Sequence, residues 1–248
     1  MIQPVIQATD VHKSYASAGA DIPVLAGVDL EVAPGECVFL VGPSGSGKST
    51  LLSILGCMLT PDRGRVEIAG QDLAGVTDVE RALLRRDRIG FVFQRFQLIR
   101  GLNALQNVGL PLTLRGESPK KAARRAGELL AAVGLADKTK SRVDKLSAGQ
   151  CQRVAIARAM AGDPDLILAD EPTASLDAHN GQEAMRLLRR LASNEGKAAL
   201  VVTHDPRIFE FADRILHLDG GRIAEAGAPP RAAAEVAAPC PVGEFCDA

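Results

Sequence analysis

A glycine-rich loop between an apolar segment and a helical segment constrains this chain more than any other feature of its sequence. Glu36–Val41 is a short apolar run, as expected of a buried parallel strand, while Lys48–Leu59 has helical spacing and stops before Pro61. The loop and the first residues of the helix read GPSGSGKS and match the pattern G-x-x-x-x-G-K-[ST]. A strand, such a loop and a helix in succession predict an α/β fold with a mainly parallel sheet.

The loop has the chemistry of a phosphate-binding site. Its glycines allow successive backbone N–H groups to turn inward around an anion, and the helix N-terminus adds the positive end of its dipole. Lys48 can reach the β- and γ-phosphates of a nucleotide, and the Ser49 hydroxyl is placed to bind Mg²⁺. The alternative is a glycine-rich turn that matches the pattern by chance, which the flanking strand and helix disfavour. The residues predicted to bind the nucleotide in this segment are Gly42, Pro43, Ser44, Gly45, Ser46, Gly47, Lys48, Ser49 and Thr50.

Two adjacent acids end a second apolar strand, which is predicted at Leu166–Asp170. Asp170 suits the coordination shell of Mg²⁺, usually through water, and Glu171 suits a general base or a residue that positions the attacking water. Two acids at a strand end would mean little alone, because they also occur there as solvated caps. Together with the phosphate loop they predict nucleotide hydrolysis.

The first third of the chain has the pattern of strands. Val5–Tyr15 and Val24–Val32 alternate in the β sense, and the loop Ala16–Pro23 joins them. Arg65–Ile68 and Ile89–Phe93 are further strand candidates. We expect an antiparallel β subdomain beside the parallel core.

The middle third predicts a helical subdomain inserted at about residues 96–162. After it the alternation of strands and helices resumes, and a hairpin is predicted across Gly220-Gly221. The segments with helical spacing in the middle third are Asn103–Leu114, Ser118–Val133 and Gly149–Ala161. The later segments are a helix at Ala178–Asn194 and strands at Ala198–Thr203, Arg214–Asp219 and Arg222–Ala226.

Composition argues against a nucleic-acid partner. The 248 residues carry a net charge of -1, only 3% are aromatic and Trp is absent, so both the general positive charge and the stacking platforms are lacking. The apolar fraction of 46% is that of a globular protein. The Arg- and Lys-rich stretches Arg81–Arg88 and Arg115–Arg125 are interpreted as solvated helix faces, with a surface near anionic lipid headgroups as the alternative.

We expect the chain to lie in the cytoplasm. The longest apolar candidate, Gly101–Leu114, is too short to span a membrane, and the N-terminus lacks the pattern of a signal peptide. Cys37, Cys57 and Cys151 are expected to be buried free thiols. The Ala- and Pro-rich segment 228–248 is expected to be a mobile tail.

At the segment LSAGQCQRVAIARA the sequence resembles the ABC ATPases, whose signature segment it closely matches. Further elements of that family follow in order around it, and the resemblance covers roughly residues 2–227. It implies one ABC ATPase domain at 1–227, a P-loop nucleotide hydrolase. The matching elements are Leu146–Ala159, the Q-loop glutamine Gln94, the D-loop Ser175-Leu176-Asp177, the switch histidine His204 and the aromatic residue Tyr15, which would stack on adenine.

The resemblance further implies ATP and Mg²⁺ as cofactors and a homodimer that closes head to tail on two ATP molecules. Ser147 and the Gly149 amide of one subunit would then contact the γ-phosphate held by Lys48 of the other. The residues expected to bind nucleotide across the interface are Ser147, Gly149, Gln150 and Asp177. Those expected to act in hydrolysis are Glu171, His204 and Gln94, and those expected at the metal are Ser49, Gln94 and Asp170.

One residue departs from the family pattern. The family commonly has glycine where this chain has Ala148, which adds a Cβ atom near the nucleotide. The hydroxyl of Ser147 and the amide of Gly149 remain, so we expect activity to survive.

The segments Gly90–Ile99 and Asn103–Leu112 resemble the lipoprotein-releasing and macrolide-exporter type ATPases. That resemblance implies export, lipoprotein release or transmission of motion through integral membrane permease subunits with extracytoplasmic domains. The ATPase would then lie on the inner face of the plasma membrane. The alternatives are a soluble ABC ATPase of DNA repair or translation and a generic nucleotide-binding switch or kinase. The first usually carries two such domains, a coiled coil or a zinc module, and the second lacks the signature segment.

Overall fold

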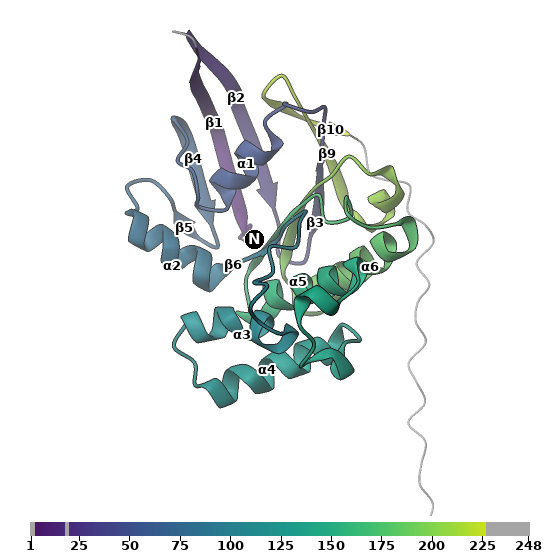
Figure 1. Ribbon diagram of the computed structural model, residues 1–248. Coiled ribbons are helices and arrows are strands. Elements are labelled where there is room, and N and C mark those ends of the chain that lie inside the picture. Colours follow the sequence, from purple (N-terminus) through teal and green to yellow (C-terminus); the bar gives the residue numbers. More distant parts are fainter. Residues whose placement is uncertain (1–2, 18–19, 227–248) are drawn as a thin grey trace, which may run out of the picture.

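The computed structural model describes residues 3–17 and 20–226, and in these the chain forms two sheets with helices packed around them (Figure 1). The larger sheet has the strand order β10-β9-β3-β8-β7-β6, in which β10 runs antiparallel to β9 and every other neighbouring pair is parallel. Its strands are β3 (Cys37–Val41), β6 (Ile89–Val92), β7 (Leu166–Asp170), β8 (Ala198–Val202), β9 (Arg214–Asp219) and β10 (Arg222–Ala226).

The smaller sheet is antiparallel and is built mainly from the N-terminal part of the chain. Its strand order is β2-β1-β4-β5, and β1 pairs with both β2 and β4. The strands are β1 (Ile6–Ser17), β2 (Ala20–Val32), β4 (Arg63–Ile68) and β5 (Gln71–Asp72). This sheet shares a hydrophobic core with one face of the larger sheet, since Ile6, Val28 and Leu40 belong to one buried cluster.

The central strands are apolar along their whole length because both of their faces are covered. All five residues of β3 and all five of β8 are buried, which explains why these segments show an unbroken apolar run instead of alternation. Phe39 in β3 is fully buried and meets Phe209 edge to face, with the ring centroids 6.4 Å apart.

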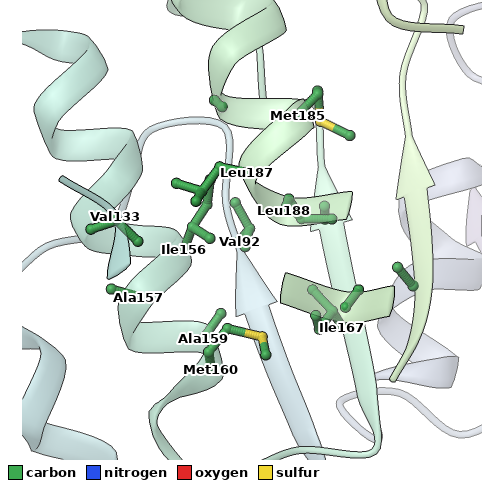
Figure 2. Packing of buried hydrophobic residues seen from close by; sticks show 14 of the residues in the cluster. Val92, Val133, Ile156, Ala157, Ala159, Met160, Ile167, Met185, Leu187 and Leu188 are labelled. Carbon is green, nitrogen blue, oxygen red and sulfur yellow. The ribbon is translucent and has the colours of Figure 1, made fainter. Parts of the chain in front are cut away.

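Three helices in the middle of the chain pack on one another, and the last of them packs on β6 of the larger sheet. They are α3 (Ala104–Leu114), α4 (Pro119–Ala132) and α5 (Ala148–Ala161), and α6 (Ala178–Asn194) packs beside α5. Their starts are encoded locally, because Asn103 and Ser118 cap α3 and α4 with their side chains and Pro119 occupies the first turn of α4. Figure 2 shows the core that they share with the sheet, including Val92, Ile156, Met160 and Ile167.

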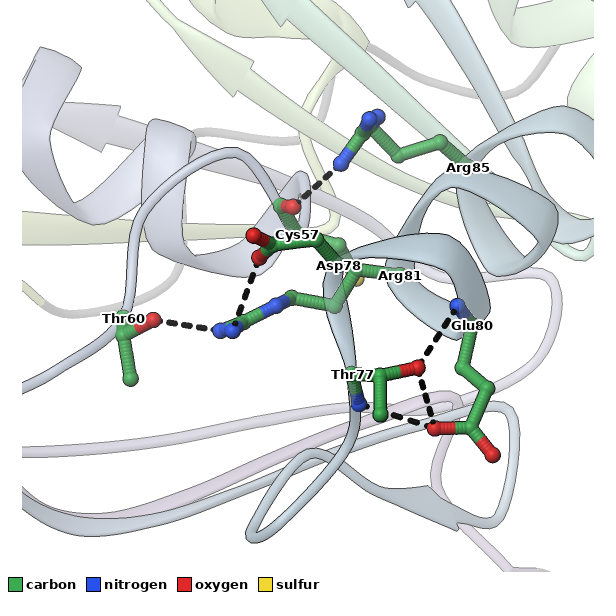
Figure 3. A network of polar contacts seen from close by, with 7 residues as sticks. All are labelled: Cys57, Thr60, Thr77, Asp78, Glu80, Arg81 and Arg85. Atoms are coloured by element: carbon green, nitrogen blue, oxygen red, sulfur yellow. Dashed lines mark hydrogen bonds and ion pairs between the residues drawn. The ribbon is translucent and has the colours of Figure 1, made fainter.

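Two more helices lie at the junction of the two sheets. α1 (Lys48–Leu55) follows β3, and α2 (Asp78–Arg88) precedes β6. The Thr77 hydroxyl accepts from the Glu80 amide while the Glu80 carboxylate accepts from the Thr77 amide, a reciprocal capping box (Figure 3). Arg85 anchors α2 by donating a hydrogen bond, at 2.5 Å, to the carbonyl of Cys57.

Two expectations about local structure were wrong. The segment Ala16–Pro23 is largely strand, because β1 continues to Ser17 and β2 begins at Ala20, with Ala16 paired to Asp21. This end of the hairpin is exposed, so ladder hydrogen bonds hold it without an alternating apolar pattern. The first helix ends at Leu55 and not at Leu59. Gly56 caps it, and a Cβ at position 56 would lie 2.6 Å from the Phe91 ring.

Of the other expectations, some were met and one concerns residues outside the described ranges. Cys37, Cys57 and Cys151 are buried free thiols, and burial raises the pKa of Cys37 to about 12 and that of Cys57 to about 11. The expected mobile tail, 228–248, lies outside the described residues. Within the described ranges, every helix is too short or too polar to cross a membrane.

Candidate active site

The phosphate loop lies between β3 and α1 in a conformation that requires glycine. Gly47, the residue before α1, has φ 102°, and a Cβ there would lie 2.8 Å from the carbonyl oxygen of Val24. A Cβ at Gly42 would lie 2.1 Å from the carbonyl oxygen of Leu218, which is closer than any real contact. The spacing of glycines in the sequence pattern therefore reflects both backbone conformation and the close approach of neighbouring chain.

Lys48 is held over the loop by the loop's own backbone. Its Nζ donates to the carbonyl oxygens of Gly42 and Pro43, each at 2.8 Å. The Ser46 hydroxyl is buried and has no hydrogen-bond partner among the described residues. The loop thus gathers a cation, an unpaired hydroxyl and the start of α1 at one place, an arrangement suited to an anion.

Parallel pairing brings the predicted catalytic residues to this loop. β8 lies between β3 and β7, so the carboxyl ends of the three strands are neighbours. Residues at or just after these strand ends line one pocket of about 770 Å³. The predicted residues that line it are Gly42, Pro43, Ser44, Gly45, Gly47, Lys48, Ser49, Thr50, Gln94, Asp170, Glu171 and His204.

Glu171 is held in a strained and specific position. Its φ is 46°, in the left-handed region that non-glycine residues seldom adopt, and its amide donates to the carbonyl of Val202 at 2.9 Å. Its Oε1 lies 2.7 Å from Nδ1 of His204. Its Oε2 is buried and has no hydrogen-bond partner among the residues described. One carboxylate oxygen is therefore fixed by the histidine while the other remains free to accept a proton or a hydrogen bond.

Asp170 lies in an environment that disfavours its charge. Burial raises the pKa of its carboxyl, the neighbouring charge of Glu171 raises it further, and Lys48 opposes both effects. A cation beside Asp170 would relieve this cost, which is the electrostatic requirement of a metal-binding carboxylate.

The loop that follows β6 is tied to two distant segments. The Gln94 carbonyl accepts a hydrogen bond from Ser175 Oγ at 3.1 Å. Arg158 of α5 donates to the carbonyls of Phe96 and Gln97 at 2.8 and 2.6 Å, and both of these residues have positive φ. Sequence reasoning gave Arg158 no role, because its partners lie about 60 residues away and no local pattern indicates them.

The signature residues lie at the start of α5. Ser147 caps this helix: its Oγ accepts from the Gln150 amide at 3.2 Å, and its own amide donates to Gln150 Oε1 at 3.0 Å. Ser147 and Ala148 are exposed and Gly149 is buried. None of these residues belongs to the described lining of the pocket, so the structure does not bring them to their own phosphate loop.

Asp177 and Tyr15 also lie outside the lining of the pocket. Asp177 is exposed and caps α6, where its carboxylate accepts from the amide of Asn180 at 3.0 Å. Tyr15 is 44% exposed, and its hydroxyl lies 3.5 Å from Oγ1 of Thr50, which does line the pocket. Tyr15 therefore stands at the edge of the site with its ring available.

A family model described as ABC transporter matches residues 25–174, which include the phosphate loop, the signature segment and Glu171. The chain belongs to the ABC transporter family. It forms an ATP-binding cassette of that family, so ATP is the nucleotide of the pocket. The expected α/β fold of the ABC ATPase type is confirmed by structural similarity to the ATP-binding cassette MJ0796, which was solved as a dimer bound to ADP and Pi. That cassette is 41% identical, with a TM-score of 0.80 over 89% of this chain and 98% of that one.

The relatives are named as transporter components. The lipoprotein-releasing system ATP-binding protein LolD of Novosphingobium aromaticivorans is 43% identical over 89% of this chain and 99% of its own length. The macrolide export ATP-binding/permease protein MacB of Syntrophobacter fumaroxidans is 44% identical over 88% of this chain. The chain spans 31% of that MacB protein's length, so it matches the cassette part of a longer relative.

Replacing Asp170 by Asn should stabilise the nucleotide-free protein at neutral pH. The folded-state pKa of Asp170 is raised, so the folded protein loses stability as pH rises from the unfolded value, about 4, through the raised value. The gain from Asn should be full near pH 7, should shrink as pH falls, and should vanish below about pH 4, where the carboxyl is protonated in both states. Urea unfolding of both proteins across this range measures it. A variant that is less stable than its parent at pH 7 would contradict the electrostatic account.

Proposed function

We propose that this chain is the ATP-hydrolysing subunit that drives a membrane permease, and that two copies close head to tail on ATP. One observation carries the proposal. Lys48, Glu171 and His204 share one pocket, whereas Ser147 and Asp177 are exposed outside its lining on the same chain. A second copy could bring these exposed residues to the pocket, since one chain by itself does not.

Within one subunit, different side chains bind the phosphates, the attacking water and the metal ion. Lys48 and the amides of the phosphate loop bind the phosphates of ATP, and the free Oε2 of Glu171 accepts the proton of the attacking water or orients it. His204 holds the other carboxylate oxygen and is itself 75% exposed, so it can also reach the γ-phosphate. Ser49, Gln94 and Asp170 offer oxygen ligands for Mg²⁺, which neutralises charge on the phosphates when it is bound.

Across the proposed dimer, the start of α5 would complete the partner's site. Ser147 Oγ accepts a hydrogen bond from the Gln150 amide. Its own hydroxyl proton is not used in that bond and can be donated to a γ-phosphate. Gly149 and Gln150 lie in the first turn of α5, where helix amides point outward and the dipole favours an anion. The cassette MJ0796 was solved as a dimer in two structures, which supports association of two copies of this chain.

An apolar groove offers a docking surface for the permease. It has a volume of about 390 Å³ and lies where α2, β6, α3 and α5 meet, with Phe91, Phe93 and Leu110 among its lining residues. At its edges Met58 is 51% exposed and Leu114 is 64% exposed. We infer that a short apolar helix on the cytoplasmic side of the permease occupies it, because the MacB relatives join such a cassette to a permease in one chain.

One loop connects the groove to the active site. Gln97 and Arg158 line the groove, and the bond between them fixes the loop that starts at Gln94. A permease helix in the groove would thus press on the loop that contacts ATP. The proposed partner has extracytoplasmic domains, the ATPase is peripheral on the inner face of the plasma membrane, and the work is export, lipoprotein release or mechanotransmission.

The substitution Glu171→Gln should stop hydrolysis while ATP binding persists. Glutamine keeps the shape of the side chain but cannot take a proton. With Mg-ATP the variant should form a dimer in light scattering, and with Mg-ADP it should remain a monomer. Turnover at the parental rate would contradict the role of Glu171.

The head-to-tail geometry is tested by adding Ser147→Arg to Glu171→Gln. A long cation at the start of α5 should block closure, so the Mg-ATP dimer should disappear while each subunit still binds ATP in calorimetry. Persistence of the dimer would rule out Ser147 as the contact across the interface.

Tyr15 is expected to stack on adenine. Tyr15→Phe should leave ATP affinity nearly unchanged, because the ring remains and the hydroxyl is 3.5 Å from its neighbour. Tyr15→Ala should weaken binding by about 1–3 kcal/mol, the range for aromatic stacking on a base. Equal affinities of the two variants in calorimetry would remove Tyr15 from the site.

Docking in the groove is tested by Leu114→Glu, with Val79→Glu as the matched control on an exposed apolar residue outside the groove lining. In cells that produce the protein naturally, the parent and the control should sediment with membranes, and Leu114→Glu should move to the soluble fraction. Both variants should keep ATP binding. Equal membrane retention of all three proteins would contradict the proposed docking surface.

A further inference from the structure

The starts of α5 and α6, which are proposed to meet the partner subunit, contact each other within one subunit. The contact is made by Asn180, in the first turn of α6, against Gly149, in the first turn of α5. A Cβ built on Gly149 would lie 2.5 Å from Asn180 Oδ1 and 2.9 Å from its Cγ. The Asn180 side chain therefore fills the space that any larger residue at position 149 would need.

The other end of the same side chain is held by the D-loop. Asn180 Nδ2 donates to Asp177 Oδ2 at 2.6 Å, and the Asn180 amide donates to Asp177 Oδ1 at 3.0 Å. These two bonds, the amide's first, hold the pKa of Asp177 below its usual range. Asn180 is thus fixed between an ionised carboxylate on one side and the signature glycine on the other.

Backbone conformation does not explain why position 149 is glycine. Gly149 lies inside a helix and is absent from the described glycines with positive φ, so its backbone would accept alanine. Alanine would even be the better helix former by about 1 kcal/mol. The neighbouring Ala148 shows that this turn accepts a Cβ where the side chain is exposed. The three described atoms nearest to a Cβ at 149 all belong to the Asn180 side chain.

We propose that Asn180 is a positioning residue that sets the spacing between the signature segment and the D-loop, so that Ser147 and Asp177 meet the partner subunit together. The side chain acts as a spacer, because its Nδ2 donates a hydrogen bond to Asp177 and its Oδ1 lies against Gly149. Capping of α6 is a separate matter, because the bond from the Asn180 amide to Asp177 survives any substitution at 180 other than proline. The inference rests on the proposed ATP-driven dimer.

The experiment uses the Glu171→Gln protein, whose Mg-ATP dimer is followed by light scattering against concentration. Adding Asn180→Ala should weaken dimerisation roughly tenfold, equivalent to about 1.4 kcal/mol, while ATP affinity of the single subunit stays unchanged. The matched control is His179→Ala, an exposed neighbour in the same helical turn, which should dimerise like the parent. Asn180→Ser should weaken dimerisation as Asn180→Ala does but should keep the thermal stability, because serine can still bond Asp177.

A second arm tests the contact itself. Gly149→Ala should strongly weaken the dimer, because its Cβ collides with Asn180. Adding Asn180→Ala should restore part of the association, since the space is then free. Equal damage from Gly149→Ala with and without Asn180 would overturn the proposal, as would full dimerisation of Asn180→Ala and Asn180→Ser. Absence of a Mg-ATP dimer in Glu171→Gln alone would instead overturn the proposed function, so the two failures are distinct.

Discussion

The parallel pairing of β3, β8 and β7 is the constraint on which the rest of the site depends. Each strand ends in a residue or loop that carries chemistry, and parallel register brings those ends to one edge of the sheet. Burial of β3 and β8 on both faces fixes that register, because a shift would move apolar side chains out of the core. The phosphate loop, Asp170 and His204 thus meet because the strands that precede or contain them are packed in this register.

Much of this arrangement follows from sequence because the signals are local. β7, α6 and β9 begin and end at the predicted residues. Most residues that line the pocket were predicted from the phosphate loop, the Asp-Glu pair and the family motifs, whereas Val24 and Val202 were not. The extension of the hairpin past Tyr15 could not be found, because its exposed end is held by hydrogen bonds that leave no apolar pattern. α1 ends where Gly56 caps it and Cys57 takes a positive φ of 56°, a backbone conformation that the sequence around a cysteine does not indicate.

The contacts that join the motifs to one another were beyond sequence reasoning for the same physical reason. Ser175 bonds the Gln94 carbonyl, Arg158 bonds two carbonyls of the same loop, and Asn180 abuts Gly149. Each contact links a side chain to backbone across a long stretch of chain, and no pattern of residue types within either segment indicates such a partner. The motifs can be recognised from residue types, whereas the contacts between them can be seen only in the folded structure.

The separation of Ser147 from the pocket of its own chain has a genetic consequence. If every composite site takes its phosphate loop from one subunit and its helix start from the other, defects in the two parts segregate when different chains mix. A dimer of one chain damaged at Lys48 and one damaged at Ser147 would concentrate both lesions in a single site and leave the other site intact. Two inactive alleles of this one gene would then complement each other, which two lesions within one self-contained pocket could never do.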